Sequence, residues 1–251
     1  PSGLTTFEIP SGMTYSSSLI SLLSGITTLQ SITVAPENTY FKASNHALYD
    51  SNWNLLVVPK AMTKYTIPKE VKTLEYDELF KGSAITEIDY EAGGTEPLSI
   101  TGYRSKSAFY GAEKLKTVTL PGRTLVDEYA FSGMSSLKTV NLEEGITTLG
   151  KNAFNGCSNL ETIILPSTLL KIGNSCFQSC KSIQELVIPA SVTIVENYAF
   201  YYWTEEQTIV MPFVSSFDPT SAEGYNWESD WNYKCAAKIV GTDSTTEGAT
   251  A

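Results

Sequence analysis

Apolar residues recur along this chain at a nearly constant interval of 22 or 23 residues. The clearest marker is a phenylalanine that follows alanine or cysteine, at Phe109, Phe131, Phe154, Phe177 and Phe200. A second marker has the same period, because a short run of alternating apolar residues ends at Leu120, Leu142, Leu165, Ile188 and Met211. Two markers with one period predict a solenoid, in which each repeat forms one coil and stacks on the next.

One full repeat, residues 160–180, contains two short apolar segments followed by the Cys-Phe step. Apolar residues occupy the alternating positions Ile163 and Leu165, with Leu160 leading in, which predicts a half-buried strand. A proline follows most of these strands and should end them, since proline has no N–H for a strand ladder. A second apolar pair predicts another short strand, and the segment around Phe177 is expected to form a helical or 3₁₀ turn. Neighbouring repeats must stack to bury these residues, at about 4.8 Å per strand.

This unit resembles the BspA-like leucine-rich repeats of bacterial surface proteins, whose consensus reads L-x-x-I-x-L-P, I-x-x-I-G and A-F-x-x-C. Gly150 and Gly173 match the consensus glycine, and Cys157 and Cys180 match its final cysteine. Glu143 departs from the pattern, since it replaces the proline. The resemblance implies an α/β-type repeat fold, a leucine-rich repeat solenoid with short parallel strands and short helical or 3₁₀ turns.

The resemblance covers roughly residues 29 to 235 and also implies a β-hairpin insertion near the N-terminus. Residues 50–54 supply good turn chemistry for that hairpin. The array is irregular to about residue 100 and regular after it. We therefore expect an N-terminal cap that includes a short helix at 1–28, the repeat array at 29–216, a C-terminal cap at 217–235, and a tail or linker at 236–251.

The cysteines leave two arrangements open. Cys157 and Cys180 occupy one column of adjacent repeats, so their Cα atoms should be about 4.8 Å apart, which a disulfide tolerates. Their Cβ atoms should also be nearer 4.8 Å than the roughly 3.8 Å that a bridge prefers, which favours buried free thiols. Cys176 is expected to be buried as a small apolar residue, and Cys235 lies alone in the cap. Cysteine usage therefore does not decide the cellular compartment.

The composition excludes some classes of function. The 251 residues carry a net charge of −10, with 17 basic residues scattered among 27 acidic ones, which argues against nucleic-acid binding. No run of 18 apolar residues is present, so we expect no membrane-spanning segment. The N-terminus has no secretory signal, so either the protein is cytosolic or the chain begins after signal cleavage. The resemblance favours the second and implies an extracellular or cell-surface location.

The sequence contains few residues for catalysis. His46 is the one histidine, has no second histidine at zinc-binding spacing, and is expected in a surface hairpin loop. Pairs of neighbouring acids that could hydrolyse glycosides occur at Glu143–Glu144, Glu205–Glu206 and Asp89 with Glu91. Adjacent acids on a turn point in different directions, so we expect them to be solvated. With no phosphate-binding loop, EF-hand spacing or Cys-x-x-Cys motif, we expect no enzyme, no metal and no cofactor.

Two groups of residues are candidates for a partner-binding surface. Ile164, Val187 and Val210 occupy one column of a strand face that should meet solvent, and an apolar patch of this kind often marks a contact. The alternatives are that a cap or the tail covers them, or that the register is shifted by one. Tyr201 and Tyr202 suit protein or sugar contacts if exposed, although their proximity to the aromatic cap favours structural packing. Trp203 is expected to fill the buried column of the consensus cysteine.

These features predict a non-catalytic extracellular binding or adhesion module with a protein or glycan partner. The physical basis is the long array of exposed side chains that a solenoid offers. Adhesion itself comes only from the resemblance, because BspA-like proteins are associated with attachment to host proteins and to other cells. The alternative is a structural spacer that projects another domain from the bacterial surface. The sequence identifies neither the ligand nor the oligomeric state.

Overall fold

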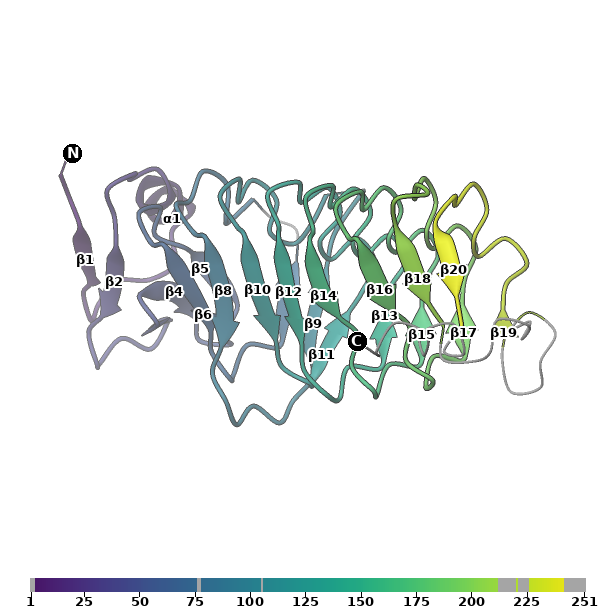
Figure 1. Ribbon diagram of the computed structural model, residues 1–251. Helices are drawn as coiled ribbons and strands as arrows, with labels where there is room; N and C mark the ends of the chain where they lie inside the picture. The colour runs from purple at the N-terminus through teal and green to yellow at the C-terminus, as the bar shows by residue number, and fades with distance from the viewer. Residues whose placement is uncertain (1–2, 76–77, 105, 212–219, 221–225, 242–251) are drawn as a thin grey trace, which may run out of the picture.

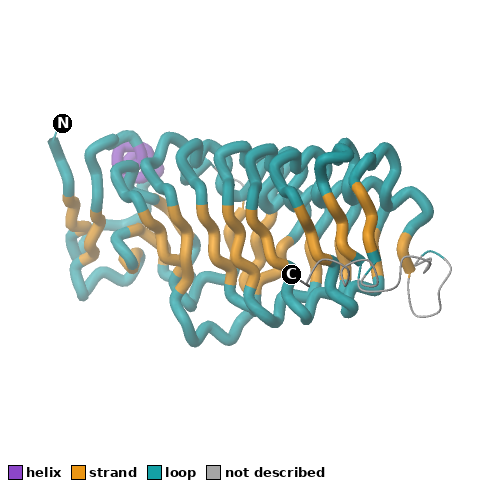
Figure 2. Tube along the Cα trace, in the orientation of Figure 1, coloured by secondary structure: helices purple, strands orange, loops and turns teal. Residues whose placement is uncertain are grey.

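The structure is a computed structural model that describes residues 3–75, 78–104, 106–211, 220 and 226–241. The chain winds into an elongated solenoid, whose coils follow one another from the N-terminal to the C-terminal end (Figure 1). Most coils contribute one short strand to each of two faces, and the strands of each face pair in parallel (Figure 2). This arrangement confirms the predicted leucine-rich repeat solenoid. It contains very little helix.

The first face is formed by the strand that contains Ile163 and by the equivalent strands of the other repeats. The longer of its two sheets contains β6 (Lys64–Ile67), β8 (Glu87–Tyr90), β10 (Thr117–Leu120), β12 (Thr139–Leu142) and β14 (Thr162–Ile164). The other contains β16 (Glu185–Val187), β18 (Thr208–Val210) and β20 (Lys238–Val240). Side chains alternate between core and surface along these strands, as the period of two predicts.

The second face is one continuous sheet of shorter strands. It contains β7 (Thr73–Glu75), β9 (Leu98–Thr101), β11 (Thr124–Val126), β13 (Thr148–Leu149), β15 (Lys171–Ile172), β17 (Ile194–Val195) and β19 (Asn226–Trp227). The consensus glycines allow this close stacking. A Cβ atom added to Gly173 would lie 2.7 Å from the carbonyl carbon of Gly150 in the preceding repeat, which is too close for any side chain.

The N-terminal part has its own small core and contains α1 (Ser17–Ser24), the only helix in the described part of the chain. The side chain of Ser16 caps this helix by accepting from the Leu19 N–H. β1 (Thr6–Ile9) pairs in parallel with β2 (Ser31–Val34), and an antiparallel sheet follows, built from β3 (Phe41–Ser44), β4 (Ala47–Asp50) and β5 (Leu55–Val57). The expected hairpin insertion is therefore present, and Asp50 accepts hydrogen bonds from the Asn52 and Asn54 backbone N–H groups in its second turn.

The C-terminal boundary predicted at residue 235 is wrong. Lys238–Val240, assigned to a tail, form β20 and pair in parallel with β18. Asn226–Trp227, assigned to a cap, pair with β17 and so extend the second face by one strand. Most of residues 217–225 and all of 242–251 lie outside the described residues. Residues 238–251 contain neither the proline nor the phenylalanine marker of the repeat, which is why β20 resembles a linker in the sequence.

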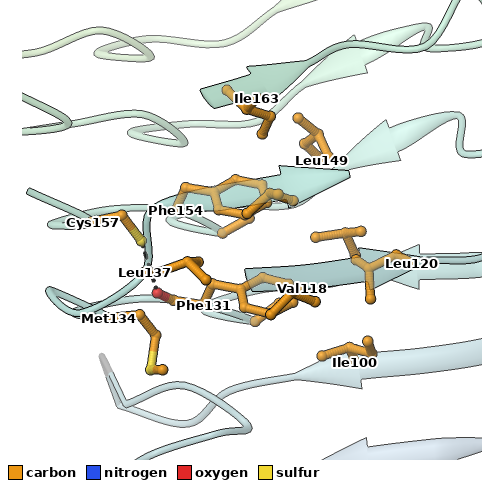
Figure 3. Close-up of a cluster of buried hydrophobic side chains, with 14 of the residues drawn as sticks. Ile100, Val118, Leu120, Phe131, Met134, Leu137, Leu149, Phe154, Cys157 and Ile163 are labelled. Atoms are coloured by element: carbon orange, nitrogen blue, oxygen red, sulfur yellow. Dashed lines mark hydrogen bonds between the residues drawn. The ribbon is translucent and has the colours of Figure 1, made fainter. Parts of the chain in front are cut away.

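The recurring phenylalanines form one stacked column through the core. Ring centroids of successive members from Phe109 to Phe200 lie 5.2 to 6.0 Å apart, with planes inclined by only 3° to 20°. Figure 3 shows two of them, Phe131 and Phe154, among the apolar residues of neighbouring strands. Trp203 and Trp231 meet the last ring edge-on and end the column. The predicted single spine is therefore confirmed.

The segment before each phenylalanine is a series of separate turns. Each turn has the three-residue hydrogen-bond spacing of a 3₁₀ turn, as in the bond from Asn155 N–H to Asn152 O at 3.2 Å. From Phe131 onward, the residue two positions before the phenylalanine has left-handed backbone, with φ of 58° at Tyr129, 54° at Asn152, 53° at Ser175 and 62° at Tyr198. A residue with positive φ interrupts a right-handed helix, so the turns do not join into one.

The cysteine column is buried and forms no disulfide. Cys157 and Cys180 each donate a hydrogen bond from Sγ to the phenylalanine carbonyl of the preceding repeat, at 3.1 Å, and Cys176 is also buried and free. Trp203 takes the same column in the next repeat, because its Nε1–H donates to Phe177 O at 2.8 Å. The structure thus confirms free thiols and the predicted place of Trp203.

These thiols should be unreactive in the folded protein. Burial raises the pKa of Cys157 to about 12 and that of Cys180 well above its usual value, so at pH 8 neither forms the thiolate that reacts. We expect iodoacetamide at pH 8 to modify only Cys235, which is partly exposed, and to modify all four cysteines in denaturant. Mass spectrometry counts the modified thiols. Modification of three or four thiols in the folded protein at the rate of a free peptide cysteine would contradict the buried column.

Candidate functional site

The candidate surface lies on the first face, where the outward column of the later repeats is apolar. Register pairs Thr119 with Asn141 and Asn141 with Ile164, and it separately pairs Val187 with Val210. The column is therefore aligned as predicted from the repeat period. The column starts with the polar residues Thr119 and Asn141, and Asn141 Nδ2 donates a hydrogen bond to Thr119 Oγ1 at 3.2 Å.

The hydrogen-bonded ladder of the first face is interrupted between β14 and β16. Both strands lie wholly within the described residues, yet they belong to different sheets. Elsewhere the two coils that contain β14 and β16 remain hydrogen-bonded to each other. β15 pairs with β17 on the second face, and Phe177 N–H donates to Ala199 O at 2.8 Å. The phenylalanine rings of these two repeats are 6.0 Å apart, against 5.2 Å for Phe131 and Phe154. The two coils are thus separated on one face only.

The interruption leaves backbone groups unpaired on both sides. In the following repeat, Thr208 N–H donates to Gln184 O at 2.8 Å, but the equivalent bond from Glu185 N–H to Glu161 O is absent. Ile188 N–H likewise donates to Val210 O at 2.8 Å, but the equivalent bond from Leu165 N–H to Val187 O is absent. Cα atoms of the two strands still lie within 8 Å of each other, whereas a further strand between them would need roughly twice 4.8 Å. The interruption is therefore a local loss of hydrogen bonds and leaves no room for another strand.

Ile164 and Val187 are exposed, whereas Val210 is not. Ile164 is 75% exposed and Val187 is 55% exposed, but Val210 is only 8% exposed. The prediction of a three-residue patch is therefore wrong at Val210. The physical reason is its register, since Val187 and Val240 flank Val210 on either side in the same column. Ile164 and Val187 each have a column neighbour on one side and the gap on the other.

A shallow groove of about 560 Å³ runs over this gap. Its apolar lining includes Ile164 and Val187, and its acidic lining consists of Glu144, Glu161 and Glu185. Within the described part of the chain no lysine or arginine lines it. The groove therefore combines two exposed apolar side chains with three carboxylates.

The three carboxylates are held differently. Glu144 accepts hydrogen bonds from the backbone N–H and hydroxyl of Ser167 and from Thr168 N–H, and these bonds hold its pKa below the usual range. Glu161 forms an ion pair with Lys138 at 2.7 Å. Glu185 makes no ion pair with any described residue. Of the three carboxylates, Glu185 is therefore the one best placed to form an ion pair with a bound partner.

The two tyrosines do not join this groove. Tyr201 stacks on Tyr233, with ring centroids 6.0 Å apart, and its ring lies 3.9 Å from that of Tyr202. Hydrogen bonding from Tyr202, together with Lys234, lowers the pKa of Tyr201. Tyr202 is 50% exposed, so one of the pair reaches solvent and the other packs against the C-terminal segment. The predicted residues therefore fall into two separate places.

The histidine considered for catalysis lies near one of the acidic residues, but its ring bonds to a serine. Asn45 and His46 form the turn of the hairpin between β3 and β4, with φ of 47° and 69°, so the surface loop expected for His46 is confirmed. Its Nδ1 lies 3.0 Å from Ser31 Oγ, and within the described residues no carboxylate bonds to its other nitrogen. Asp89 pairs with Lys64, and Glu91 accepts from Nδ2 of Asn45, the residue beside His46. Asp89 and Glu91 are thus held by Lys64 and Asn45.

No group of three or more His, Cys, Asp or Glu residues in the described part of the chain is arranged to hold a metal ion. No helix among the described residues is long and apolar enough to cross a bilayer. The sequence did not reveal the ladder interruption, because both repeats around it have the same alternating pattern.

Comparison with known proteins agrees with the fold and with the repeat pattern. Solved structures share the solenoid architecture. One is a leucine-rich repeat protein from Eubacterium ventriosum, with 24% identity, a TM-score of 0.51, and coverage of 78% of this chain and 58% of that one. Another is the pneumococcal vaccine antigen PcpA, with 18% identity, a TM-score of 0.61, and coverage of 95% of this chain and 56% of that one. The chain thus spans less than two thirds of the length of both.

The sequence match is more specific. Residues 103–221 match the model of the BspA type leucine rich repeat region, in six copies. These residues therefore belong to the BspA-type leucine-rich repeats, as the resemblance indicated. No curated protein is similar enough in sequence to match the chain.

Proposed function

We propose that this chain is a non-catalytic extracellular module for binding or adhesion, which presents a repeat-built surface to a protein or glycan partner. The observation that carries the proposal is the exposure of Ile164 and Val187 beside a groove, since the equivalent position on the preceding strands is polar, as at Thr119 and Asn141. Exposed apolar side chains that gather in one place are typical of contact surfaces. A solenoid offers such a surface on a rigid array, because each repeat is held by its neighbours.

The location and the absence of catalysis belong to the same proposal. The BspA-type repeats and the structural likeness to a pneumococcal vaccine antigen support a place at the bacterial surface. The contacts of His46 support a role without catalysis, because its ring bonds to Ser31 and to no carboxylate among the described residues. We therefore expect recognition to be the whole activity of the described array.

A second candidate is a structural spacer that projects another domain from the surface. The observation that favours it is the polar character of the first face outside the groove, where ion pairs join successive repeats. Lys64 pairs with Glu87 at 2.7 Å, and Lys138 pairs with Glu161 at 2.7 Å. Cross-strand ion pairs of this kind stabilise neighbouring strands on a solvated surface, and they need no ligand to explain them.

The test is a binding array of glycans and host extracellular proteins, probed with the wild type and with an Ile164→Asp, Val187→Asp double variant. We expect at least one ligand whose binding falls tenfold or more in the double variant, because two carboxylates would replace the apolar contact. Leu170→Asp is the matched control, since Leu170 is 48% exposed but does not line the groove, and it should leave binding within twofold. Circular dichroism confirms that each variant is folded.

The other outcomes decide between the two candidates. If the wild type binds a ligand and the double variant binds it equally well, the groove is not the contact surface. If the folded wild type binds nothing on the array, the spacer becomes the better account of the solenoid.

A further inference from the structure

We infer that β1 (Thr6–Ile9) is an association edge, at which two copies of this chain pair antiparallel and join their β1–β2 sheets into one sheet. This surface belongs to the first coil, residues 3–30, and is separate from the groove at Ile164 and Val187. Three features of the first coil support the pairing: a free backbone edge, a sequence that fits antiparallel self-pairing, and an almost uncharged surface.

The backbone of β1 has a free edge. In the described part of the chain β2 is the only strand that pairs with β1, and Figure 1 shows β1 at the N-terminal end of the solenoid with no strand beyond it. The carbonyls of Thr5 and Ile9 accept hydrogen bonds from backbone N–H groups on the β2 side. Backbone groups alternate in direction along a strand, so those of Thr6 and Glu8 point away from β2. An edge of this kind favours the addition of another strand.

β1 lacks the features that usually block strand addition. Such features are lysine or proline on the edge strand, a bulge, or a covering segment. The four residues of β1 include no lysine, arginine or proline, and their register with β2 is continuous. By contrast, β20 at the other end of the first face contains Lys238. The edge of β1 is therefore unprotected.

The sequence of β1 favours one antiparallel register. Pairing Thr6 of one copy with Glu8 of the other lets both residues exchange N–H···O bonds through their outward groups. The two-fold axis then passes beside Phe7, so that the two Phe7 side chains face each other as an aromatic cross-strand pair. Pairing Glu8 with Glu8 would instead place like charges opposite each other and set Thr6 against Pro10, which has no N–H.

The first coil is apolar and almost uncharged. Its half-buried apolar side chains are Leu4, Phe7, Met13, Leu19 and Ile20. Pairing across the two-fold axis would remove more of the Phe7 surface from water. Glu8 is the one charged side chain in residues 3–36, although the whole chain carries a net charge of −10. A second copy can therefore approach this end with little of the repulsion that it meets elsewhere.

Sedimentation velocity of this chain over a hundredfold range of concentration tests the pairing. We expect a reversible equilibrium between monomer and dimer, since a shared edge at a two-fold axis is closed to further copies. Thr6→Pro should weaken the dimer at least tenfold, because proline removes an outward N–H from each pair and leaves the bonds to β2 in place. Thr6→Ala keeps that N–H and should change the dissociation constant by less than threefold. Circular dichroism confirms that both variants are folded.

Cysteine cross-linking tests the register. Cys235 is partly exposed and is first replaced by serine. Phe7→Cys then places two thiols across the two-fold axis in a non-hydrogen-bonded pair, where Cα atoms lie about 4.5 Å apart and a disulfide can form. Mild oxidation should convert most of this variant into a covalent dimer. Glu8→Cys is the matched control, because it lies opposite Thr6 of the second copy, and it should cross-link at least tenfold more slowly.

Several outcomes would overturn the pairing. A chain that stays monomeric over the whole concentration range has no such edge contact, and a dimer that Thr6→Pro leaves unchanged uses another surface. Dimerisation that Ile164→Asp with Val187→Asp abolishes would place the interface at the groove. Species larger than a dimer would indicate contacts between opposite ends of the solenoid. Ligand binding on the array is independent of all these results, so their failure leaves the proposed function standing.

Discussion

Replacing Phe154 with alanine should lower the free energy of unfolding by about 3–5 kcal/mol, the usual cost of removing a buried phenylalanine side chain. Phe154 is fully buried, and its ring stacks on Phe131 at 5.2 Å and on Phe177 at 5.6 Å. Truncation therefore removes ring contacts to both neighbouring repeats and leaves a cavity in the middle of the array. The Tm should fall by roughly 6–20 °C, since each kcal/mol shifts Tm by about 2–4 °C in a chain of this size.

Urea unfolding followed by circular dichroism measures this loss. Leu170→Ala is the control, because Leu170 is exposed and its truncation should change the free energy of unfolding by no more than about 0.5 kcal/mol. Phe154→Leu should lie between the two, since leucine fills part of the ring volume. A loss below about 1 kcal/mol for Phe154→Ala would mean that the stacked rings do not hold neighbouring repeats together.

The sequence predicts the spine and the columns because both depend on local offsets. A side chain at the same position of each 22- or 23-residue repeat meets its counterpart in the next repeat, so Phe131, Cys157 and Trp203 could be placed in columns before the structure was known. The observed register of Thr119, Asn141 and Ile164 follows from the same counting. Stacking of equivalent positions is thus the part of the fold that a period determines.

The ladder interruption could not be predicted in this way. The strands at 162–164 and 185–187 have the same alternation of exposed and buried positions, and a proline follows each within two residues. Pairing between them depends on how two coils tilt relative to each other, which is set by packing along the whole array. The burial of Val210 is also non-local, since it depends on pairing with β20, which lies 30 residues away along the chain. The candidate site was therefore only partly predictable.

Replacing Trp203 with alanine should be as costly as truncating the spine, but its effect should be confined to the C-terminal repeats. Trp203 is buried, meets the edge of Phe200 at 5.2 Å, and donates from Nε1 to Phe177 O. Alanine leaves a large cavity and an unsatisfied buried carbonyl, so we expect a loss of about 3–5 kcal/mol. Because each repeat contacts only its neighbours, that loss should not spread to the N-terminal repeats.

Hydrogen exchange measured by mass spectrometry resolves this difference. In Trp203→Ala, amide protection should fall in β16, β18 and β20, while the amides of β6 and β8 should exchange as in the wild type. Trp53→Ala is the matched control, because Trp53 lies in the N-terminal hairpin turn against Tyr49, with ring centroids 5.5 Å apart, and should deprotect only that end. Equal loss of protection along the whole chain in Trp203→Ala would show that the array unfolds as one unit. That result would contradict the expectation that the stability of each coil depends mainly on its two neighbours.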